Sequence, residues 1–153
     1  MNNLLPLPVL LPLLGAGLAL ALNRRPRAQR VVATAVLVSV TTIAALLVGL
    51  TDSRGPLVLW VGSWPQPLGI ALVADGPSVV MLALSSIVVL ATAVAGTIDG
   101  RLIGSASFWP LVGAATAAVN GVFVAGDLFS IYVLLELLTL AAVGLVALGG
   151  EKA

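Results

Sequence analysis

One short polar face on an apolar segment is the part of this sequence best suited to chemistry. Glu136 is the single acidic residue in the run 128–148. Tyr132 comes four residues before it and Thr139 three residues after it, so a helix would place all three side chains on one face. A carboxyl group can bind and release a proton, and hydroxyl groups can orient it. The spacing therefore indicates a site that handles protons or cations.

The segment that carries Glu136 is about long enough to cross a lipid bilayer. Glu136 comes eight residues after its start, roughly 12 Å along a helix. An acidic side chain at that depth costs on the order of several kcal/mol, so such residues face protein or water and usually have a function. The alternative is a protonated Glu136 that makes one hydrogen bond between helices.

Composition places the chain in a membrane. Of its 153 residues, 60% are hydrophobic and 8% are charged, whereas soluble domains have about 25% charged residues. The net charge of +1 predicts no nucleic-acid partner. The sequence has no Cys and no His, which excludes disulfides, thiolate chemistry and His-based metal sites within it. With no phosphate loop and no nucleophile–base pair, we expect no enzyme active site, cofactor or metal in this chain.

Five apolar runs predict an all-α membrane protein, with about five transmembrane helices in a single domain, 1–153. The runs cover 4–22, 31–50, 77–98, 108–125 and 128–148. Asp127 is a predicted N-cap of the last helix, and Gly149 and Gly150 mark its end.

The segment 51–75 is too polar and too broken to cross the membrane. Two β-prone stretches, 57–64 and 69–73, flank the sequence Pro65-Gln66-Pro67, which predicts a short hairpin between the second and third helices. Trp60 and Trp64 are placed to anchor it at the outer membrane interface.

Basic residues predict the orientation, because Lys and Arg collect in cytoplasmic loops. With five spans, one side receives Arg24, Arg25, Arg27, Arg30, Arg101 and Lys152, and the other receives Arg54. We therefore expect an N-terminus outside and a C-terminus in the cytoplasm, in the plasma (inner) membrane. The first run follows no charged residue and precedes the arginines, so we expect a retained helix rather than a cleaved signal peptide.

Other polar residues allow two interpretations. Asp127 is either a helix cap alone or also an ion entrance, and Asn120 is either a packing residue or part of a pathway. Ser85 and Ser86 are expected to bond back to their own helix. The fourth run is rich in small residues, which favours close helix packing. These are Gly113, Ala114, Ala115, Ala117, Ala118 and Gly121.

Two regions of the chain resemble a known family. The stretch from Asn120 to Glu136, NGVFVAGDLFSIYVLLE, is similar to the signature of the antiporter-like membrane subunits. Mrp-type cation/proton antiporters, respiratory complex I and membrane-bound hydrogenases share these subunits. The stretch VGSWPQPLGI at 61–70, followed by LVADG at 72–76, most resembles the Mrp D subunit. The resemblance covers nearly the whole chain, but only the beginning of such a subunit.

This resemblance implies a role for Glu136. In the family, five helices and an outer hairpin precede the first discontinuous helix, and an essential glutamate on the fifth helix corresponds to Glu136. It pairs with a lysine on a later helix and modulates proton movement along a central hydrophilic axis. Here the sole lysine is Lys152, outside the spans. The missing helices would come from another chain if the gene is split, or the chain is a truncated remnant.

The resemblance implies a component of a proton-translocating multi-subunit membrane complex, most like the D subunit of an Mrp monovalent cation/proton antiporter. Its partners would be other membrane subunits, including a chain that supplies the downstream helices, together with protons, monovalent cations and the lipid bilayer. The alternatives are a membrane subunit of a complex I or hydrogenase type oxidoreductase and a non-conducting structural remnant. The candidate residues for proton translocation are Glu136, Tyr132, Thr139, Asp127 and Asn120.

Overall fold

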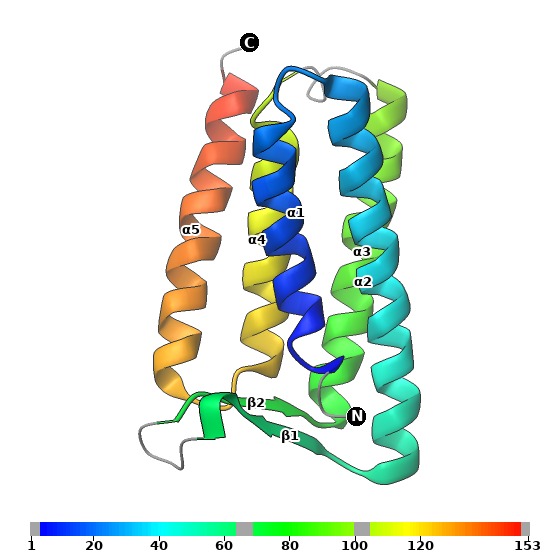
Figure 1. The fold of residues 1–153 in the computed structure, drawn as a ribbon, viewed down its shortest axis with the longest axis vertical. Helices are drawn as coiled ribbons and strands as arrows, with labels where there is room; N and C mark the ends of the chain where they lie inside the picture. The colour runs from blue at the N-terminus through cyan, green and yellow to red at the C-terminus, as the bar shows by residue number, and fades with distance from the viewer. Residues whose placement is uncertain (1–3, 64–68, 100–104, 151–153) are drawn as a thin grey trace.

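Five helices and a two-stranded hairpin form the computed structural model, in which residues 4–63, 69–99 and 105–150 are described. The helices run side by side in alternating directions (Figure 1). They are α1 (Leu7–Ala21), α2 (Pro26–Arg54), α3 (Gly76–Asp99), α4 (Phe108–Val124) and α5 (Leu128–Gly150). Each apolar run of the sequence has become one helix, so the prediction of a mostly helical chain with five helices is confirmed.

Helix α2 extends beyond the apolar run that predicted it. It begins at Pro26 and ends at Arg54, whereas the run covers 31–50. Pro26 occupies the first turn, where its missing N–H costs no hydrogen bond. At the other end Gly55 has φ 79°, a conformation that stops the helix. The apolar run therefore marks the part of the helix suited to lipid, and polar turns continue the helix on both sides.

Three of the described helices are long and apolar enough to cross a membrane, namely α2, α3 and α5. Helices α1 and α4 are shorter apolar helices of 15 and 17 residues. Together they make the chain a multi-pass membrane protein. Helix α4 lies between α1, α3 and α5, whereas α1 packs on α2 and α4 and exposes several leucines on its other side.

The predicted hairpin is present between α2 and α3. Strands β1 (Leu57–Trp60) and β2 (Ala71–Ala74) are antiparallel, with Leu57 opposite Ala74 and Trp60 opposite Ala71. The first strand is shorter than expected, because the chain turns into a 3₁₀ segment at Val61–Ser63, where Gly62 has φ 72°. Trp64 and Pro65-Gln66-Pro67 lie outside the described residues.

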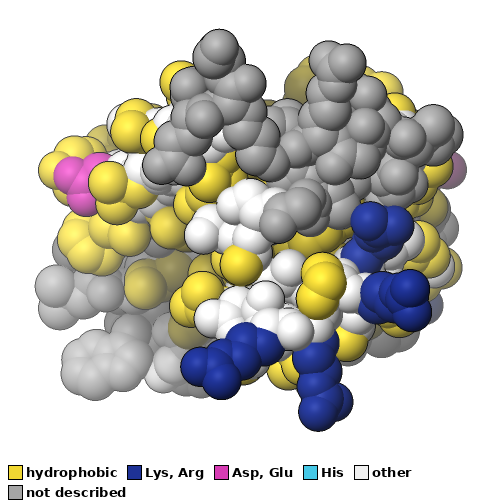
Figure 2. All heavy atoms as spheres, turned by 90° about the horizontal axis from the view of Figure 1, so that it is seen from above, with side chains coloured by type: hydrophobic (Ala, Val, Ile, Leu, Met, Phe, Trp, Pro, Cys, Tyr) yellow, Lys and Arg dark blue, Asp and Glu magenta, His cyan; other side chains and the backbone are white. Residues whose placement is uncertain are grey.

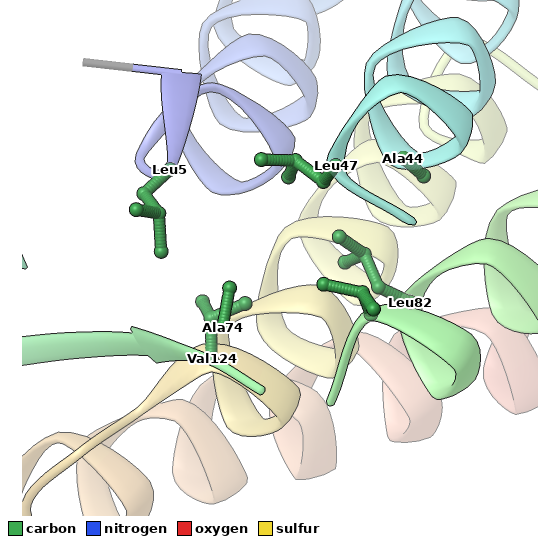
Figure 3. Packing of buried hydrophobic residues seen from close by; sticks show 7 residues of the cluster. Leu5, Ala44, Leu47, Ala74, Leu82 and Val124 are labelled. Carbon is green, nitrogen blue, oxygen red and sulfur yellow. The ribbon is translucent and has the colours of Figure 1, made fainter. Parts of the chain in front are cut away.

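The hairpin crosses one end of the bundle and closes the largest hydrophobic cluster (Figures 1 and 3). The cluster draws on α2, α3, α4 and β2, and on the segment that precedes α1. Its buried members are Leu5, Ala44, Leu47, Ala74, Val79, Leu82 and Val124. Because Ala74 lies among helix residues, the hairpin has a fixed position over the ends of the helices, which we call the hairpin end.

Helix α4 is the element on which α1 and α5 both pack. A methyl group on Gly113 would lie 2.9 Å from the carbonyl oxygen of Pro12 in α1. One on Gly121 would lie 2.6 Å from Leu134 Cδ2 in α5. At Gly113 the neighbour is a backbone atom, so glycine is required for this close approach. At Gly121 the end of the Leu134 side chain would have to shift to admit a methyl group. The small residues of the fourth run are therefore a packing feature, as the sequence predicted.

Asn120 joins α4 to two other helices. Pro12 has no N–H, so the carbonyl of Pro8, four residues earlier in α1, lacks its helical donor. The side-chain nitrogen of Asn120 donates to that oxygen over 3.0 Å, and its Oδ1 accepts from Ser85 of α3 over 3.0 Å. Asn120 is fully buried. Its contacts explain it as a packing residue, and a pathway role remains a separate proposal.

The first prediction concerns this bond. Replacing Asn120 with Ala leaves the Pro8 carbonyl buried without a donor, which should cost about 1–3 kcal/mol of unfolding free energy. The same substitution in a Pro12→Ala background should cost less, because Ala has an N–H that can bond to Pro8 within the helix. Unfolding in detergent micelles measures both values. If Asn120→Ala lowers the unfolding free energy equally in the two backgrounds, the bond to Pro8 is not what Asn120 contributes.

Candidate functional site

Glu136 and Tyr132 are in direct contact on α5. The hydroxyl of Tyr132 donates a hydrogen bond to Oε1 of Glu136, one helical turn away. This confirms that the two side chains share a face. The second carboxylate oxygen has no hydrogen bond among the described residues, so it is available to a proton, a water molecule or a partner.

Thr139 lies on the same face but bonds elsewhere. Its hydroxyl donates to the carbonyl oxygen of Leu135 over 2.9 Å, which is a bond within its own helix. Thr139 therefore helps to line the groove around Glu136 without holding its carboxylate. The groove is shallow and open, and its lining is Tyr132, Leu135, Glu136, Thr139 and Leu140.

The groove faces away from the bundle. Helix α5 packs on α4 with its other side, through Leu134 and Gly144. Tyr132 is 61% exposed, and Glu136 and Thr139 are exposed as well. An acidic side chain that faced hydrocarbon would cost several kcal/mol. We conclude that this face of α5 needs to be covered by protein or by water that the described residues do not supply.

Asp127 caps α5 and also fastens it to the hairpin. Its Oδ1 accepts from the backbone N–H of Ser130 over 2.8 Å. Its Oδ2 accepts from the Ser130 hydroxyl over 2.8 Å and from the backbone N–H of Ala71 over 3.3 Å. A second link runs from the N–H of Gly126 to the carbonyl of Ala71 over 2.8 Å. The predicted cap is therefore present, and the start of α5 is tied to β2.

These contacts determine the charge of Asp127. Partial burial acts to raise its pKa, but the hydrogen bonds from Ser130 and from the Ala71 backbone outweigh burial and hold the pKa below the usual 3.8. Asp127 is thus ionised at neutral pH, next to the positive end of the α5 dipole. A permanently charged cap suits an anchoring role.

A second cap of the same kind, which was not predicted from the sequence, precedes α3. Asp75 precedes α3, and its Oδ1 accepts from the backbone N–H of Ser78 over 2.9 Å. The Ser78 side chain, together with that N–H, lowers the pKa of Asp75. Both caps have the spacing Asp-x-x-Ser, as in Asp127 and Ser130. That repeated spacing ahead of two apolar runs was the signal that could have identified Asp75.

Gln29 is a second residue that was missed. It is 1% exposed although it lies among four arginines. Its side-chain nitrogen donates to the carbonyl oxygens of Ala19, over 2.8 Å, and Ala106, over 2.7 Å. It fixes the end of α1 and the turn before α4 to the start of α2. Its nearest polar neighbours in the sequence are basic and exposed, so no local pattern could have revealed this role.

The predicted site residues thus occupy three places. Tyr132, Glu136 and Thr139 share the open groove, Asp127 lies at the start of the same helix, and Asn120 lies inside the bundle. Ser85 bonds back to Leu82 over 3.2 Å as expected. For Ser86 that expectation is wrong, because its buried hydroxyl has no partner among the described residues.

Comparison with curated proteins gives several relatives, although no family model matches the chain. The sequence is 35% identical to the Na⁺/H⁺ antiporter D subunit of Bacillus subtilis, over 99% of this chain and 31% of that protein. It is 33% identical to the protein of the same name in Alkalihalophilus pseudofirmus, over 99% and 31%. It is 33% identical to the D subunit of a probable K⁺/H⁺ antiporter of Rhizobium meliloti, over 97% and 29%. The chain spans about a third of the length of these relatives.

Two solved structures have the same fold. A chain of the Mrp complex from Dietzia sp. DQ12-45-1b matches with a TM-score of 0.87 and 32% identity, over 94% of this chain and 27% of that chain. A chain of the membrane-bound sulfane sulfur reductase, an archaeal respiratory membrane complex, matches with a TM-score of 0.83 and 20% identity, over 93% and 29%. At that identity, the second match establishes the fold alone.

The bundle, the hairpin and the matched structures define a membrane protein with the fold of the antiporter-like subunits. More particularly, the chain is homologous to the N-terminal part of the Mrp antiporter D subunit.

Asp127 gives a prediction on pH. A group whose pKa is lower in the folded state stabilises the fold above its unfolded pKa, and that stability is lost as the pH falls through the folded pKa. Asp127→Asn should therefore unfold more easily at neutral pH and lose less stability than the wild type below about pH 4. Thermal unfolding in detergent from about pH 3 to pH 7 measures this.

The matched control is Asp52→Asn, which changes an exposed carboxylate near the C-terminal end of α2. It should leave stability at neutral pH within about 0.5 kcal/mol of the wild type. If Asp127→Asn and Asp52→Asn have the same pH profile, Asp127 is not the anchor described above.

Proposed function

We propose that this chain forms the N-terminal, five-helix part of a proton-translocating antiporter subunit in a multi-subunit membrane complex of the Mrp type. The support is 35% identity to the D subunit of a Na⁺/H⁺ antiporter and a TM-score of 0.87 to a chain of an Mrp complex. All five helices cross the membrane in this proposal. Helix α4 is flanked by α1, α3 and α5, so it need not match the bilayer thickness of about 30 Å.

Glu136 is the proton-handling group. The observation that carries this assignment is the position of an acidic side chain on the uncovered face of α5, with Tyr132 bonded to one of its oxygens. The relatives are about three times as long as this chain, so further helices are available to cover that face. We infer that one of these helices, on this protein or on a partner chain, brings a lysine to Glu136.

The proposed cycle uses the free oxygen of Glu136. Tyr132 holds Oε1, so a proton binds to and leaves from Oε2. When the lysine approaches, its charge favours the carboxylate, the O–H bond breaks and the proton passes to water. When the lysine retreats, the lone carboxylate in apolar surroundings takes up a proton again. Movement of a positive charge is thereby coupled to release and uptake of a proton.

The other candidate residues support this group. Thr139 lines the groove, where its hydroxyl oxygen can accept a hydrogen bond from water once the groove is covered. Asp127 holds the start of α5 against the hairpin, so that the helix carrying Glu136 keeps its position. Asn120 holds α4, on which α5 rests. In this assignment, Asp127 and Asn120 are positioning residues.

A non-conducting structural part of such a complex is the second candidate. The observation in its favour is that the described part of the chain places Tyr132, and no basic side chain, against Glu136. Intramembrane lysines encoded downstream, in this gene or in the next, would favour the conducting subunit. A membrane subunit of a complex I or hydrogenase type oxidoreductase would require redox centres on partner chains, encoded by neighbouring genes for Fe–S or flavin proteins.

The test of Glu136 is exchange activity. Glu136→Gln and Glu136→Ala should each lower cation/proton exchange in everted vesicles at least about 100-fold, because neither side chain can transfer the proton. Tyr132→Phe keeps the carboxylate and should cause a smaller loss. Asp52→Asn is the control for expression and assembly. Wild-type exchange in both Glu136 variants would refute the assignment.

The second test concerns orientation. We propose that the N-terminus lies outside. The four arginines from Arg24 to Arg30 lie together at the end of the bundle opposite the start of α1, and basic residues favour the cytoplasmic side of a membrane. The chain has no Cys, so single cysteines can be introduced by Asn23→Cys and Ser53→Cys, at exposed positions of opposite ends. An impermeant maleimide should label Ser53→Cys in intact cells and Asn23→Cys after permeabilisation. The reverse pattern would overturn the orientation.

A further inference from the structure

Four arginines crowd the turn between α1 and α2, which we call the basic corner. Arg24 and Arg25 lie in the turn, and Arg27 and Arg30 lie in the first turns of α2, where a spacing of three places them on one face. All four are exposed. Figure 2 shows basic side chains gathered at this end of the molecule.

The acidic side chains that the structure describes lie elsewhere. Asp52, Asp75 and Asp127 are at the hairpin end, the opposite end of the bundle, and Glu136 is within α5. Asp99 ends α3 at the same end of the bundle as the basic corner. Among the described residues of this end, four arginines thus stand against one acidic residue, and the local charge is positive. A surface of this kind attracts an anion.

The backbone adds to this attraction. Helix α2 begins in the basic corner with no side-chain cap and no acidic residue in its first turn. The first bond of its ladder runs from the N–H of Gln29 to the carbonyl of Arg25 over 3.0 Å. The N–H groups of Arg27 and Ala28 precede that bond, at the positive end of a 29-residue helix. A phosphate would complement both these groups and the guanidinium side chains.

The basic corner also has a fixed framework. Gln29 is buried between the arginines and bonds to Ala19 of α1 and to Ala106 before α4. The ends of three helices are thereby held together under the arginine side chains. The backbone positions of the arginines are therefore set by packing, and only their side chains need to become ordered when a ligand binds.

Apolar side chains border the basic corner on the bundle side. Leu18 is 50% exposed, Leu20 is 58% exposed and Val31 is 67% exposed. They lie within about two helical turns of the arginines. A ligand that uses both surfaces has an anionic head and hydrocarbon tails, whereas a soluble anion would use the arginines alone.

From these features we propose that the basic corner is a binding site for an anionic phospholipid. The phosphate of the headgroup contacts the arginines and the start of α2, and the acyl chains lie along Leu18, Leu20 and Val31. The site is separate from the Glu136 groove and does not depend on ion transport. It would anchor the α1–α2 turn at the membrane surface.

The test uses the protein purified in its natural membrane assembly and depleted of lipid. Native mass spectrometry would compare dioleoyl phosphatidylglycerol with dioleoyl phosphatidylcholine, which have the same tails. We expect phosphatidylglycerol to bind at least about tenfold more tightly. Each Arg→Gln change is expected to weaken its binding about fivefold, so the pair R24Q/R27Q should lose about 25-fold. The pair R24K/R27K keeps the charge and should lose less.

The control is R54Q, at the other end of α2, which should leave phosphatidylglycerol binding unchanged. Equal binding of the two lipids would overturn the proposal, and so would an equal loss in R54Q and R24Q/R27Q. Glycerol 3-phosphate at millimolar concentration should not displace the lipid. If it does, the basic corner binds a soluble anion and the proposal of a lipid site is wrong. Exchange activity is not the readout, so failure here leaves the proposal for Glu136 unaffected.

Discussion

The hydrogen bond from Asn120 to the carbonyl of Pro8 is the contact on which the arrangement of helices depends. A proline inside a membrane helix frees a carbonyl, and in lipid each freed group needs another donor. Asn120 supplies that donor and also accepts from Ser85, so α1, α3 and α4 meet at one buried amide. The close approach of Gly113 to Pro12 lets α1 lie directly against α4. Because apolar burial gains little between helices in lipid, these polar and close-packed contacts set the geometry.

The packing of α5 on α4 determines which way the candidate site faces. Gly121 receives Leu134 and Leu111 packs on Gly144, so one side of α5 is fixed against α4. The opposite side carries Glu136 and Tyr132. A carboxylate on an outward face is costly in hydrocarbon, which makes this face a place for further helices or water rather than lipid. The uncovered face of α5 agrees with the length of the relatives. The chain spans about a third of that length, and the rest is long enough to supply further helices.

The two ends of the bundle differ in their polar groups. At the hairpin end, Asp75 and Asp127 cap α3 and α5, and Asp127 joins α5 to β2. The oxygens of both carboxylates accept hydrogen bonds from neighbouring backbone N–H groups. At the other end, Gln29 serves as the internal fastener and the arginines stay exposed. One end is therefore held by charged caps, whereas the other presents its charges to the surroundings.

Much of the fold could be predicted from the sequence. Apolar runs indicated five helices, Pro65-Gln66-Pro67 indicated a hairpin, and the spacing of Tyr132 and Glu136 placed them on one face. These features depend on local periodicity and composition, which a single segment carries within itself. The partner of Asn120, the burial of Gln29 and the outward direction of Glu136 were decided by tertiary structure. Each depends on which helix lies beside which, and that follows from contacts between residues far apart in the chain, such as Pro8 and Asn120.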